Sequence, residues 1–376
     1  MTHATLGAPA TSAHEQRPLR VGLASFGMVS RVFHAPLVRA ADGFELAAIV
    51  SSDAGKVRAA HPDVRHLPDV DALLGDPDID VVVVTTPNDT HVPLTLAAVE
   101  AGKHVVVEKP VGLDHAEALR LADAANDAAE RGLVVTAFHN RRWDGDFLSV
   151  QDALADGRPG RPVTLHSHFD RFRPEPRDRW RENGGPGSGL WLDLGPHLVD
   201  QARVLFGAPE WVQADIATIR DGARANDYAD VTLAFPGGVR AILHATTLAA
   251  ATPPRLVLHG TGGSLVVEGL DPQEAQLGSG IVPTDRGYGL AEGAQSAVLL
   301  TDGTTPTTIP RRAGEYPQFY ARLHAAITRG EAPPVSMRDA AEVMRIIEAA
   351  IRSAETGARV PLRRTSRPDE PGRSRE

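Results

Sequence analysis

The sequence predicts an α/β protein of two domains: a doubly wound parallel sheet, then an α+β domain with an open, mainly antiparallel sheet. Three observations carry this prediction. The chain has 376 residues, which exceeds the usual size of one hydrophobic core. Short apolar runs alternate with helical periodicity as far as residue 144. Beyond that point, strands follow strands.

In the first half, the clearest strand contains Val81, Val82, Val83 and Val84 in a row. Four β-branched residues together indicate a strand buried on both faces, as in a parallel sheet. The expected strands cover residues 19–25, 44–50, 80–86, 104–108 and 133–138. The expected helices cover residues 28–41, 53–60, 90–101 and 114–131. The alternation predicts a first domain over residues 19–144.

The second half reads as an α+β domain over residues 145–362, because turn signals separate successive strands. The expected strands cover residues 162–169, 211–219, 229–235, 239–247, 255–259 and 264–268. Residues 271–310 have weak periodicity, and we expect loops and a hairpin there. Helices are expected over residues 316–330 and 337–357. Residues 1–18 are expected to form a flexible arm and residues 363–376 a disordered tail.

Composition and charge exclude several classes of function. The formal net charge of −9 argues against nucleic-acid binding, which needs a basic surface. No apolar stretch approaches the length of a membrane span, and the first 18 residues lack the pattern of a secretory signal. The absence of cysteine excludes disulfides, thiolate zinc sites and cysteine nucleophiles. We expect a cytoplasmic protein with neither a nucleic-acid nor a membrane partner.

The first strand runs into a turn over residues 25–30 that occupies the place of the dinucleotide fingerprint G-x-G-x-x-G. Gly27 is its middle glycine, whose lack of a side chain lets a pyrophosphate approach the start of a helix. Ser25 and Ser30 replace the two outer glycines and are small enough for the turn. A strand–helix turn of any fold would also need small residues. The motif indicates a dinucleotide site only because it follows the first strand of a domain in which strands and helices alternate.

The end of the second strand bears on the choice between NADP and NAD. Ser51 and Ser52 stand where NAD enzymes usually place an acid that binds the ribose 2′-hydroxyl. A hydroxyl can bind a 2′-phosphate, and Lys56 and Arg58 add positive charge nearby, so NADP is favoured over NAD. Asp53 is read as the cap of the next helix. If it binds the ribose instead, the preference reverses.

Two further strand ends carry residues suited to a ligand. Residues 85–88 (TTPN) follow the four valines at the carboxyl edge of the sheet, where ligands of open α/β folds bind, although an ordinary turn is the alternative. Lys109 ends another strand and is followed by Pro110. We interpret Lys109 as pointing into the ligand crevice rather than as a surface lysine.

A glycine-rich stretch over residues 184–189 leads into a predicted helix that carries Asp193 and His197. These residues are four apart and share a helix face. Oxidation of an alcohol requires a proton acceptor, and histidine suits that role. A capping aspartate beside a structural histidine is the alternative. His166 and His168 share a strand face, but no third ligand has suitable spacing, so we predict no metal site and interpret both as structural or substrate-lining.

Taken together, these motifs resemble the Gfo/Idh/MocA family over residues 19–362. The most specific elements are the E-K-P motif at residues 108–110 and the D-x-x-x-H pair. The resemblance implies a Rossmann domain and a substrate domain whose open sheet often makes the oligomer interface, here a homodimer or homotetramer. It implies that His197 is the proton acceptor. It also implies that Lys109 binds the substrate hydroxyl and positions the nicotinamide.

The branch of NADP-dependent scyllo-inositol dehydrogenases is especially similar. The shared segments are residues 33–37 (FHAPL), 87–91 (PNDTH), 139–144 (HNRRWD) and 168–173 (HFDRFR). The resemblance implies catalytic roles for Lys109, Asp193 and His197, with Asn140 or Arg141 at the substrate. Because residues alternate along a strand, we expect only one of that last pair to face the ligand. The expected cofactor-binding residues are Ser25, Gly27, Met28, Val29, Ser51, Ser52, Thr86, Pro87, Asn88, His91, Glu108 and Lys109.

Three functions remain open at this stage. The first is an NAD(P)-dependent dehydrogenase of a cyclic polyol, with scyllo-inositol as the first choice. The second is an aldose or keto-sugar oxidoreductase with the same chemistry. The third is a dinucleotide-binding sensor without turnover, which Lys109, Asp193 and His197 disfavour because binding alone needs no proton acceptor.

Overall fold

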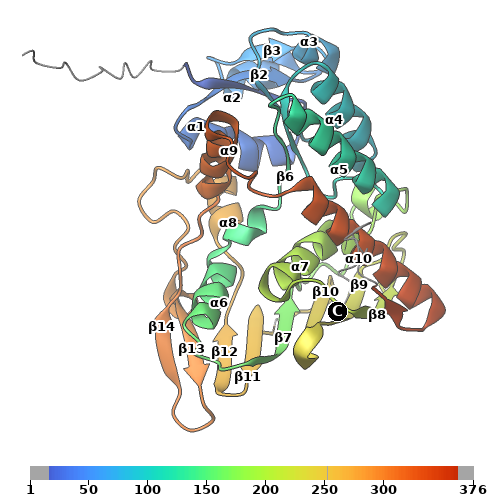
Figure 1. Ribbon diagram of the computed structural model, residues 1–376, viewed down its shortest axis with the longest axis vertical. Coiled ribbons are helices and arrows are strands. Elements are labelled where there is room, and N and C mark those ends of the chain that lie inside the picture. Colours follow the sequence, from blue (N-terminus) through green and yellow to red (C-terminus); the bar gives the residue numbers. More distant parts are fainter. Residues whose placement is uncertain (1–16, 252, 363–376) are drawn as a thin grey trace, which may run out of the picture.

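The computed structural model describes residues 17–251 and 253–362. The expectations for residues 1–16 and 363–376 lie outside the described part. The fold is divided between a six-stranded sheet and a nine-stranded sheet, seen at the top and bottom of Figure 1. Within residues 17–251 and 253–362, no helix is long and apolar enough to cross a membrane.

The first sheet is parallel throughout, in the order β3-β2-β1-β4-β5-β6. Its strands are β1 (Leu19–Leu23), β2 (Phe44–Val50), β3 (Arg65–Leu67), β4 (Val81–Val84), β5 (His104–Val107) and β6 (Val135–Ala137). The strand order reverses between β1 and β4, and such a reversal opens a ligand crevice at the carboxyl ends. All four valines of β4 are buried, as their run predicted.

Helices cover both faces of this sheet. They are α1 (Ala35–Ala40), α2 (Ala54–Ala60), α3 (Val70–Leu74), α4 (His91–Glu100) and α5 (His115–Glu130), with short turns η1 (Ser30–His34) and η2 (Asn88–Thr90). The helix predicted over residues 28–41 is present, but its middle, η1, is a π-helical turn. The elements β3 and α3 went unpredicted because three and five residues are too few for a periodic signal.

The second sheet has the order β14-β13-β12-β11-β7-β10-β9-β8-β15 and is antiparallel except between β7 and β10. Its main strands are β7 (Pro162–His168), β8 (Trp211–Ala217), β9 (Tyr228–Ala234), β10 (Arg240–Thr246), β11 (Leu256–Gly260) and β12 (Gly263–Val267). The hairpin β13 (Ala297–Thr301) and β14 (Thr307–Pro310) and the short β15 (Val360–Pro361) complete it. The predicted fold class is therefore confirmed.

The second half also contains the turn η3 (Asn140–Trp143) and the helices α6 (Gly145–Ala155), α7 (Leu190–Phe206), α8 (Gln273–Gly278), α9 (Pro317–Arg329) and α10 (Met337–Thr356). The prediction of loops at the start of the 271–310 segment was wrong, because α8 lies there. Helix α6 was also missed. It begins at Gly145, where a Cβ would lie 2.3 Å from the carbonyl oxygen of Arg312. Glycine is needed there for close packing, although it weakens the helical signal of the sequence.

The last two helices join the two halves. Helix α9 packs on α1 of the first half, and α10 packs on α5, α7 and β8 (Figure 1). The buried apolar side chains of both halves form one continuous cluster. The chain thus returns to the first sheet and holds its carboxyl edge against the second half.

Candidate active site

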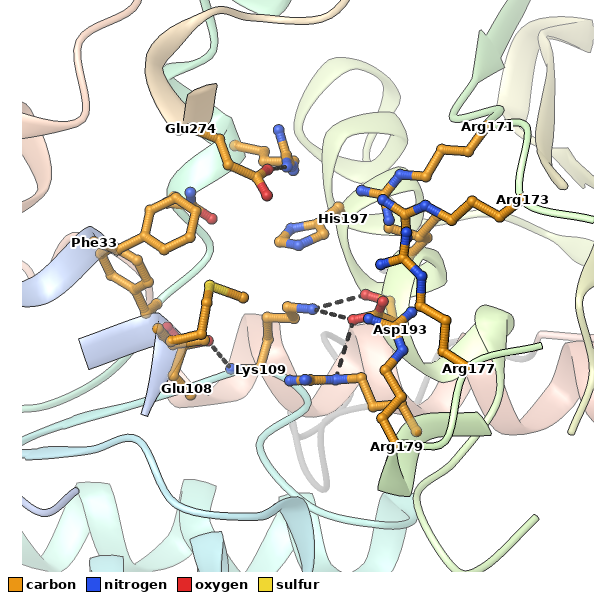
Figure 2. A pocket seen from close by; sticks show the side chains of 17 residues that line it. Phe33, Glu108, Lys109, Arg171, Arg173, Arg177, Arg179, Asp193, His197 and Glu274 are labelled. Atoms are coloured by element: carbon orange, nitrogen blue, oxygen red, sulfur yellow. Dashed lines mark hydrogen bonds and ion pairs between the residues drawn. The ribbon is translucent and has the colours of Figure 1, made fainter. Parts of the chain in front are cut away.

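A cavity of about 350 Å³ lies where the carboxyl edge of the first sheet meets the second half. Its walls come from the turn after β1, the end of β5, η3, α7, α8 and the segment 171–181 (Figure 2). The volume falls within the range of small-molecule sites. The lining residues are Met28, Val29, Phe33, Glu108, Lys109, Phe138, Asn140, Arg141, Arg171, Arg173, Arg177, Arg179, Arg181, Asp193, Leu194, His197 and Glu274.

Lys109 and Asp193, which are 84 positions apart in sequence, meet in this cavity. The Lys109 ammonium donates to the backbone oxygen of Asp193 at 2.7 Å and to its carboxylate at 3.2 Å (Figure 2). Arg181 lies 3.6 Å from the same carboxylate oxygen. Burial would raise the pKa of Asp193, but the charges of Lys109, Arg181 and Arg171 hold it well below its usual range. Asp193 is therefore a carboxylate at neutral pH.

His197 lies one helical turn after Asp193 on α7, so the predicted shared face is present. Its ring is buried, and Nδ1 has no hydrogen-bond partner among the described residues. Burial lowers the pKa of His197 well below its usual value, and the charges of Lys109 and Arg141 lower it further. The imidazole is therefore neutral near pH 7 and able to accept a proton.

Glu108 anchors the strand end that carries Lys109. Its carboxylate lies 2.9 Å from Nε2 of His34 and accepts the backbone N–H of Lys109 at 3.1 Å. Nδ1 of His34 lies 2.7 Å from the hydroxyl of Tyr320 on α9. A neutral His34 ring can donate to Glu108 and accept from Tyr320, which satisfies both nitrogens. Burial would raise the pKa of Glu108, but the hydrogen bond from His34 keeps it below its usual range.

Asn140 and Arg141 both line the cavity, so the expectation that only one of them would face it was wrong. The argument assumed a strand, but both residues lie in the 3-10 turn η3, which does not alternate its side chains. Helix α7 fixes this turn, since Gln201 donates to the carbonyl oxygen of Arg141 at 2.8 Å. Arg142 also makes two hydrogen bonds to Asp200 of α7, at 2.7 and 2.8 Å.

The turn between β1 and η1 brings three hydroxyl groups together. Ser25 lies 2.9 Å from the hydroxyl of Thr85 and 3.3 Å from that of Ser30, and it donates to the carbonyl oxygen of Thr85 at 3.0 Å. The serines at the outer fingerprint positions thus tie the ends of β1 and β4 across the reversal of strand order. Met28 and Val29 of this turn line the cavity, and Gly27 precedes them.

The other residues expected at the cofactor lie outside the lining of the cavity. His91 is buried between the carbonyl oxygens of Thr86 at 2.9 Å and Pro110 at 2.7 Å, so it ties the turns after β4 and β5 together. Asn88 donates to the carbonyl oxygen of Gly187, in the loop before α7, at 3.1 Å. Pro87 immediately precedes the turn η2.

Ser51, Ser52 and Asp53 follow β2, at the other end of the crevice. Asp53 caps α2, as predicted, because its carboxylate accepts the backbone N–H of Lys56 at 3.0 Å. This hydrogen bond lowers the pKa of the exposed Asp53. Ser51 accepts the backbone N–H of Asp53 at 3.0 Å, and Ser52 is exposed.

Sequence reasoning missed Glu274 and five arginines of the lining. Glu274 lies on α8, and its carboxylate accepts from Arg141 at 2.6 Å. The arginines had a visible signal, because residues 171–181 (RFRPEPRDRWR) contain five of them at odd-numbered positions. The resemblance to known dehydrogenases covers only the first part of this segment, up to Arg173. The arginines are Arg171, Arg173, Arg177, Arg179 and Arg181.

His168 lies beside two other possible metal ligands that its spacing in the sequence did not reveal. Ligand atoms of His168, Asp170 and His244 lie within 4.8 Å of one another, on β7, just after it, and on β10. Sequence spacing could not show this group, because strand pairing brings His244 beside His168. The absence of a metal site stays a prediction. Asp170 lies 2.8 Å from Nδ1 of His244, and this hydrogen bond raises the pKa of His244.

Two family models match the chain. The NAD-binding Rossmann-fold model of the GFO_IDH_MocA oxidoreductases matches residues 19–137, and their C-terminal alpha/beta domain matches residues 151–362. The chain belongs to the Gfo/Idh/MocA family of oxidoreductases. The resemblance drawn from the motifs is thus confirmed, and this Gfo/Idh/MocA protein is an NAD(P)-binding oxidoreductase.

Similar proteins cover nearly the whole of this Gfo/Idh/MocA chain. The uncharacterized oxidoreductase YdgJ of Escherichia coli is 47% identical, over 92% of this chain and 99% of its own. The scyllo-inositol 2-dehydrogenase (NADP(+)) IolW of Bacillus subtilis is 35% identical, over 90% and 94%. The solved structure of YPO2259 from Yersinia pestis is 42% identical, with a TM-score of 0.86 over 93% of this chain and 99% of that one.

Proposed function

We propose that the protein catalyses the reversible, NAD(P)-dependent oxidation of a ring secondary alcohol of a cyclic polyol, with scyllo-inositol as the first substrate to test. One observation carries the proposal: Lys109, Asp193 and His197 line one cavity with Met28 and Val29 of the dinucleotide turn. The similar IolW of Bacillus subtilis is a scyllo-inositol 2-dehydrogenase, which supports the choice of substrate.

In this proposal, the His197 imidazole accepts the proton of the substrate hydroxyl. It must be neutral to do so, and its lowered pKa keeps it neutral. Removal of the proton leaves negative charge on the substrate oxygen until the ring carbon loses its hydride and the carbonyl forms. The nearby positive charge of Lys109 stabilises that oxygen.

Lys109 binds and orients the reacting hydroxyl in the proposed mechanism. An ammonium group has three N–H donors, and Asp193 accepts two of them. The third is free to donate to a substrate oxygen in the cavity. Asp193 then acts by holding the ammonium in place, and Glu108 holds the backbone of Lys109 from the other side.

The residues beside the cavity fit a nicotinamide dinucleotide. The turn after β1 opens toward the reversal of strand order, and the first turn of η1 carries no acidic residue that would repel a pyrophosphate. When bound, the nicotinamide ring supplies the hydride acceptor. Ser25, Gly27, Met28 and Val29 would hold its phosphates and ring side, and Thr86, Pro87, Asn88 and His91 would shape the opposite wall.

The preference for NADP over NAD is part of the proposal. The carboxylate of Asp53 is engaged in capping α2 and lies 3.7 Å from the ammonium of Lys56, so the acid nearest the ribose end is already paired. Ser52 is exposed at the end of β2 and free to bind a 2′-phosphate. The NADP specificity in the name of the similar IolW supports the same choice.

The experiment is a substrate panel with purified protein. Reduction of NADP and of NAD is followed by the absorbance of the reduced nicotinamide, with inositols and aldoses as substrates. Turnover of scyllo-inositol with NADP supports the proposal in full. Turnover of an aldose alone supports the roles of Lys109, Asp193 and His197 but changes the substrate assignment. Tight dinucleotide binding with no turnover of any compound would favour a sensor and contradict the proposal.

A further inference from the structure

The cavity has an excess of positive charge that the binding of a neutral polyol does not require. Seven basic side chains line it against three acidic ones, although the whole chain has a formal charge of −9. The acidic groups are already engaged. Asp193 pairs with Lys109 and Arg181, Glu274 with Arg141, and Glu108 with His34. Arg179 pairs with Glu182 outside the lining, so among the described residues the unpaired positive charge of the cavity lies on Arg171, Arg173 and Arg177 and is available to a ligand.

Arg171 and Arg173 concentrate this excess. Neither guanidinium has a hydrogen bond or an ion pair to any residue in 17–251 or 253–362. The ring of Phe169, with its centroid 4.9 Å from the Arg171 guanidinium, supports that side chain from one side. Burial lowers the pKa of Arg171, which reflects the cost of holding a cation there without an anion.

The backbone holds both arginines in place. Arg171 donates its N–H to Thr246 at 2.9 Å, and Arg173 donates its N–H to Thr247 at 2.7 Å. Arg220 also donates to the carbonyl oxygen of Arg173 at 3.0 Å. From this anchored segment, both side chains point toward Lys109, Asp193 and His197 (Figure 2). A preorganised pair of guanidinium groups is suited to the planar, bidentate binding of a carboxylate or phosphate.

We infer that the substrate of the proposed reaction carries an anionic group, a carboxylate or a phosphate ester, which Arg171 and Arg173 bind while its ring hydroxyl reacts at Lys109 and His197. This inference rests on the proposed function and narrows its substrate class from cyclic polyols in general to those that carry an anionic group. An anionic oxygen could also come from the dinucleotide. The substrate is the better source, because the phosphate-binding turn at Gly27 belongs to the first domain, whereas both arginines follow β7 of the second sheet.

The test compares matched neutral and anionic compounds. We would measure kcat/KM for myo-inositol against myo-inositol 1-phosphate, and for D-glucose against D-glucuronate, with NADP present. The variants are R171Q/R173Q and R171K/R173K, with the exposed Arg161→Gln as the control. Circular dichroism and thermal melting establish that each variant is folded, and the lysine variant keeps the charge if the glutamine variant fails to fold.

We expect an anionic compound to be favoured by about tenfold or more, since one charge-assisted hydrogen bond is worth that much. In R171Q/R173Q, kcat/KM for the anionic compound should fall to that of the neutral compound measured in the same variant, so that the preference is lost. R171K/R173K should lose part of the preference, because lysine lacks the bidentate geometry, and Arg161→Gln none of it. Equal use of both compounds by the wild type would overturn the inference.

Binding measurements separate this inference from the proposed reaction. The dissociation constants of the same anions for the NADP-loaded protein, and of NADP itself, are measured by titration calorimetry. One outcome is that the anions bind, and bind more weakly to R171Q/R173Q, while no compound is turned over. In that case the proposed reaction is wrong and the anion site is supported. If the variant weakens NADP alone, the arginines bind the dinucleotide and the inference is overturned. Absence of anion binding overturns it as well.

Discussion

At the scale of single residues, the site depends on charges that modify one another. Asp193 is partly buried, and an unpaired carboxylate there would be costly. Lys109 and Arg181 compensate for that burial, and burial together with the charge of Lys109 lowers the pKa of His197 and keeps it neutral. The ion pair and the histidine are therefore electrostatically coupled, and a change of charge at one residue shifts the pKa values of the others.

His197→Gln should lower kcat by about 10²- to 10⁴-fold, because the glutamine amide cannot accept the proton. Dinucleotide binding should stay within about twofold, since His197 lies on α7 and not in the turn after β1. Steady-state kinetics and a fluorescence titration with NADP measure the two effects. His259→Gln, on the exposed part of β11, is the control. Equal losses in both measurements would mean that His197 is structural.

The pH profile should report the lowered pKa of His197. The base is active when neutral, so kcat/KM should fall only as the pH drops through the pKa of the folded state, below the ordinary value of about 6.5. Lys109→Met removes a charge that lowers this pKa, so the acidic limb of the remaining activity should move to higher pH. An unmoved limb in that variant would contradict the electrostatic coupling.

At the scale of elements, α7 organises the site. It carries Asp193 and His197 on one face, and its Asp200 and Gln201 hold η3. The helix begins after Gly189, whose φ is +102°, and a Cβ at that position would lie 2.4 Å from the side chain of Asn226. Glycine is needed there for both the backbone conformation and the close approach.

Gly189→Ala should therefore destabilise the protein by about 1–3 kcal/mol, because the strained backbone and the contact with Asn226 must both be relieved. Urea unfolding measures the loss, and kcat/KM should fall as the start of α7 shifts away from Lys109. Gly185→Ala is the matched control in the same loop, because its Cβ would meet nothing within 4 Å. Equal stability of the two variants would show that the conformation at Gly189 is unimportant.

At the scale of the whole molecule, the two halves share one core. Helix α10 packs on α5 of the first half and on α7 and β8 of the second. Ile347 on α10 is buried, and its Cδ1 lies 2.8 Å from the position of a Cβ at Gly195 of α7. The helix thus fixes α7, and the site with it, against the Rossmann domain.

Ile347→Ala should reduce the free energy of unfolding by about 2–5 kcal/mol through lost burial and a cavity. Because the core is continuous, both domains should unfold in one transition at a lower temperature. Calorimetry reports the number of transitions, and far-UV circular dichroism reports the midpoint. The exposed Arg352→Ala on the same helix should change stability by no more than about 0.5 kcal/mol. Two separate transitions in the wild type would disprove the shared core.

Prediction from sequence succeeded where the signal is local. The valine run of β4, the cap Asp53 and the Asp193–His197 spacing each depend on residues close together in the chain, and all three are as predicted. It failed where an element is short or begins at a glycine, as in α8 and α6. The strand argument for Asn140 and Arg141 failed because β6 ends at Ala137, three residues before Asn140.

The sequence by itself determined the two-domain class, the family and the residue types at the site, because periodicity and motifs are properties of neighbouring residues. Only the tertiary structure decided which of them meet. The pairing of Lys109 with Asp193, the bond between Glu108 and His34 and the gathering of His168 with His244 join segments far apart in the chain. The arginines of residues 171–181 are visible in the sequence, but only the fold gathers them with Lys109 and Arg141 around one cavity, because charge density depends on distances in the folded chain.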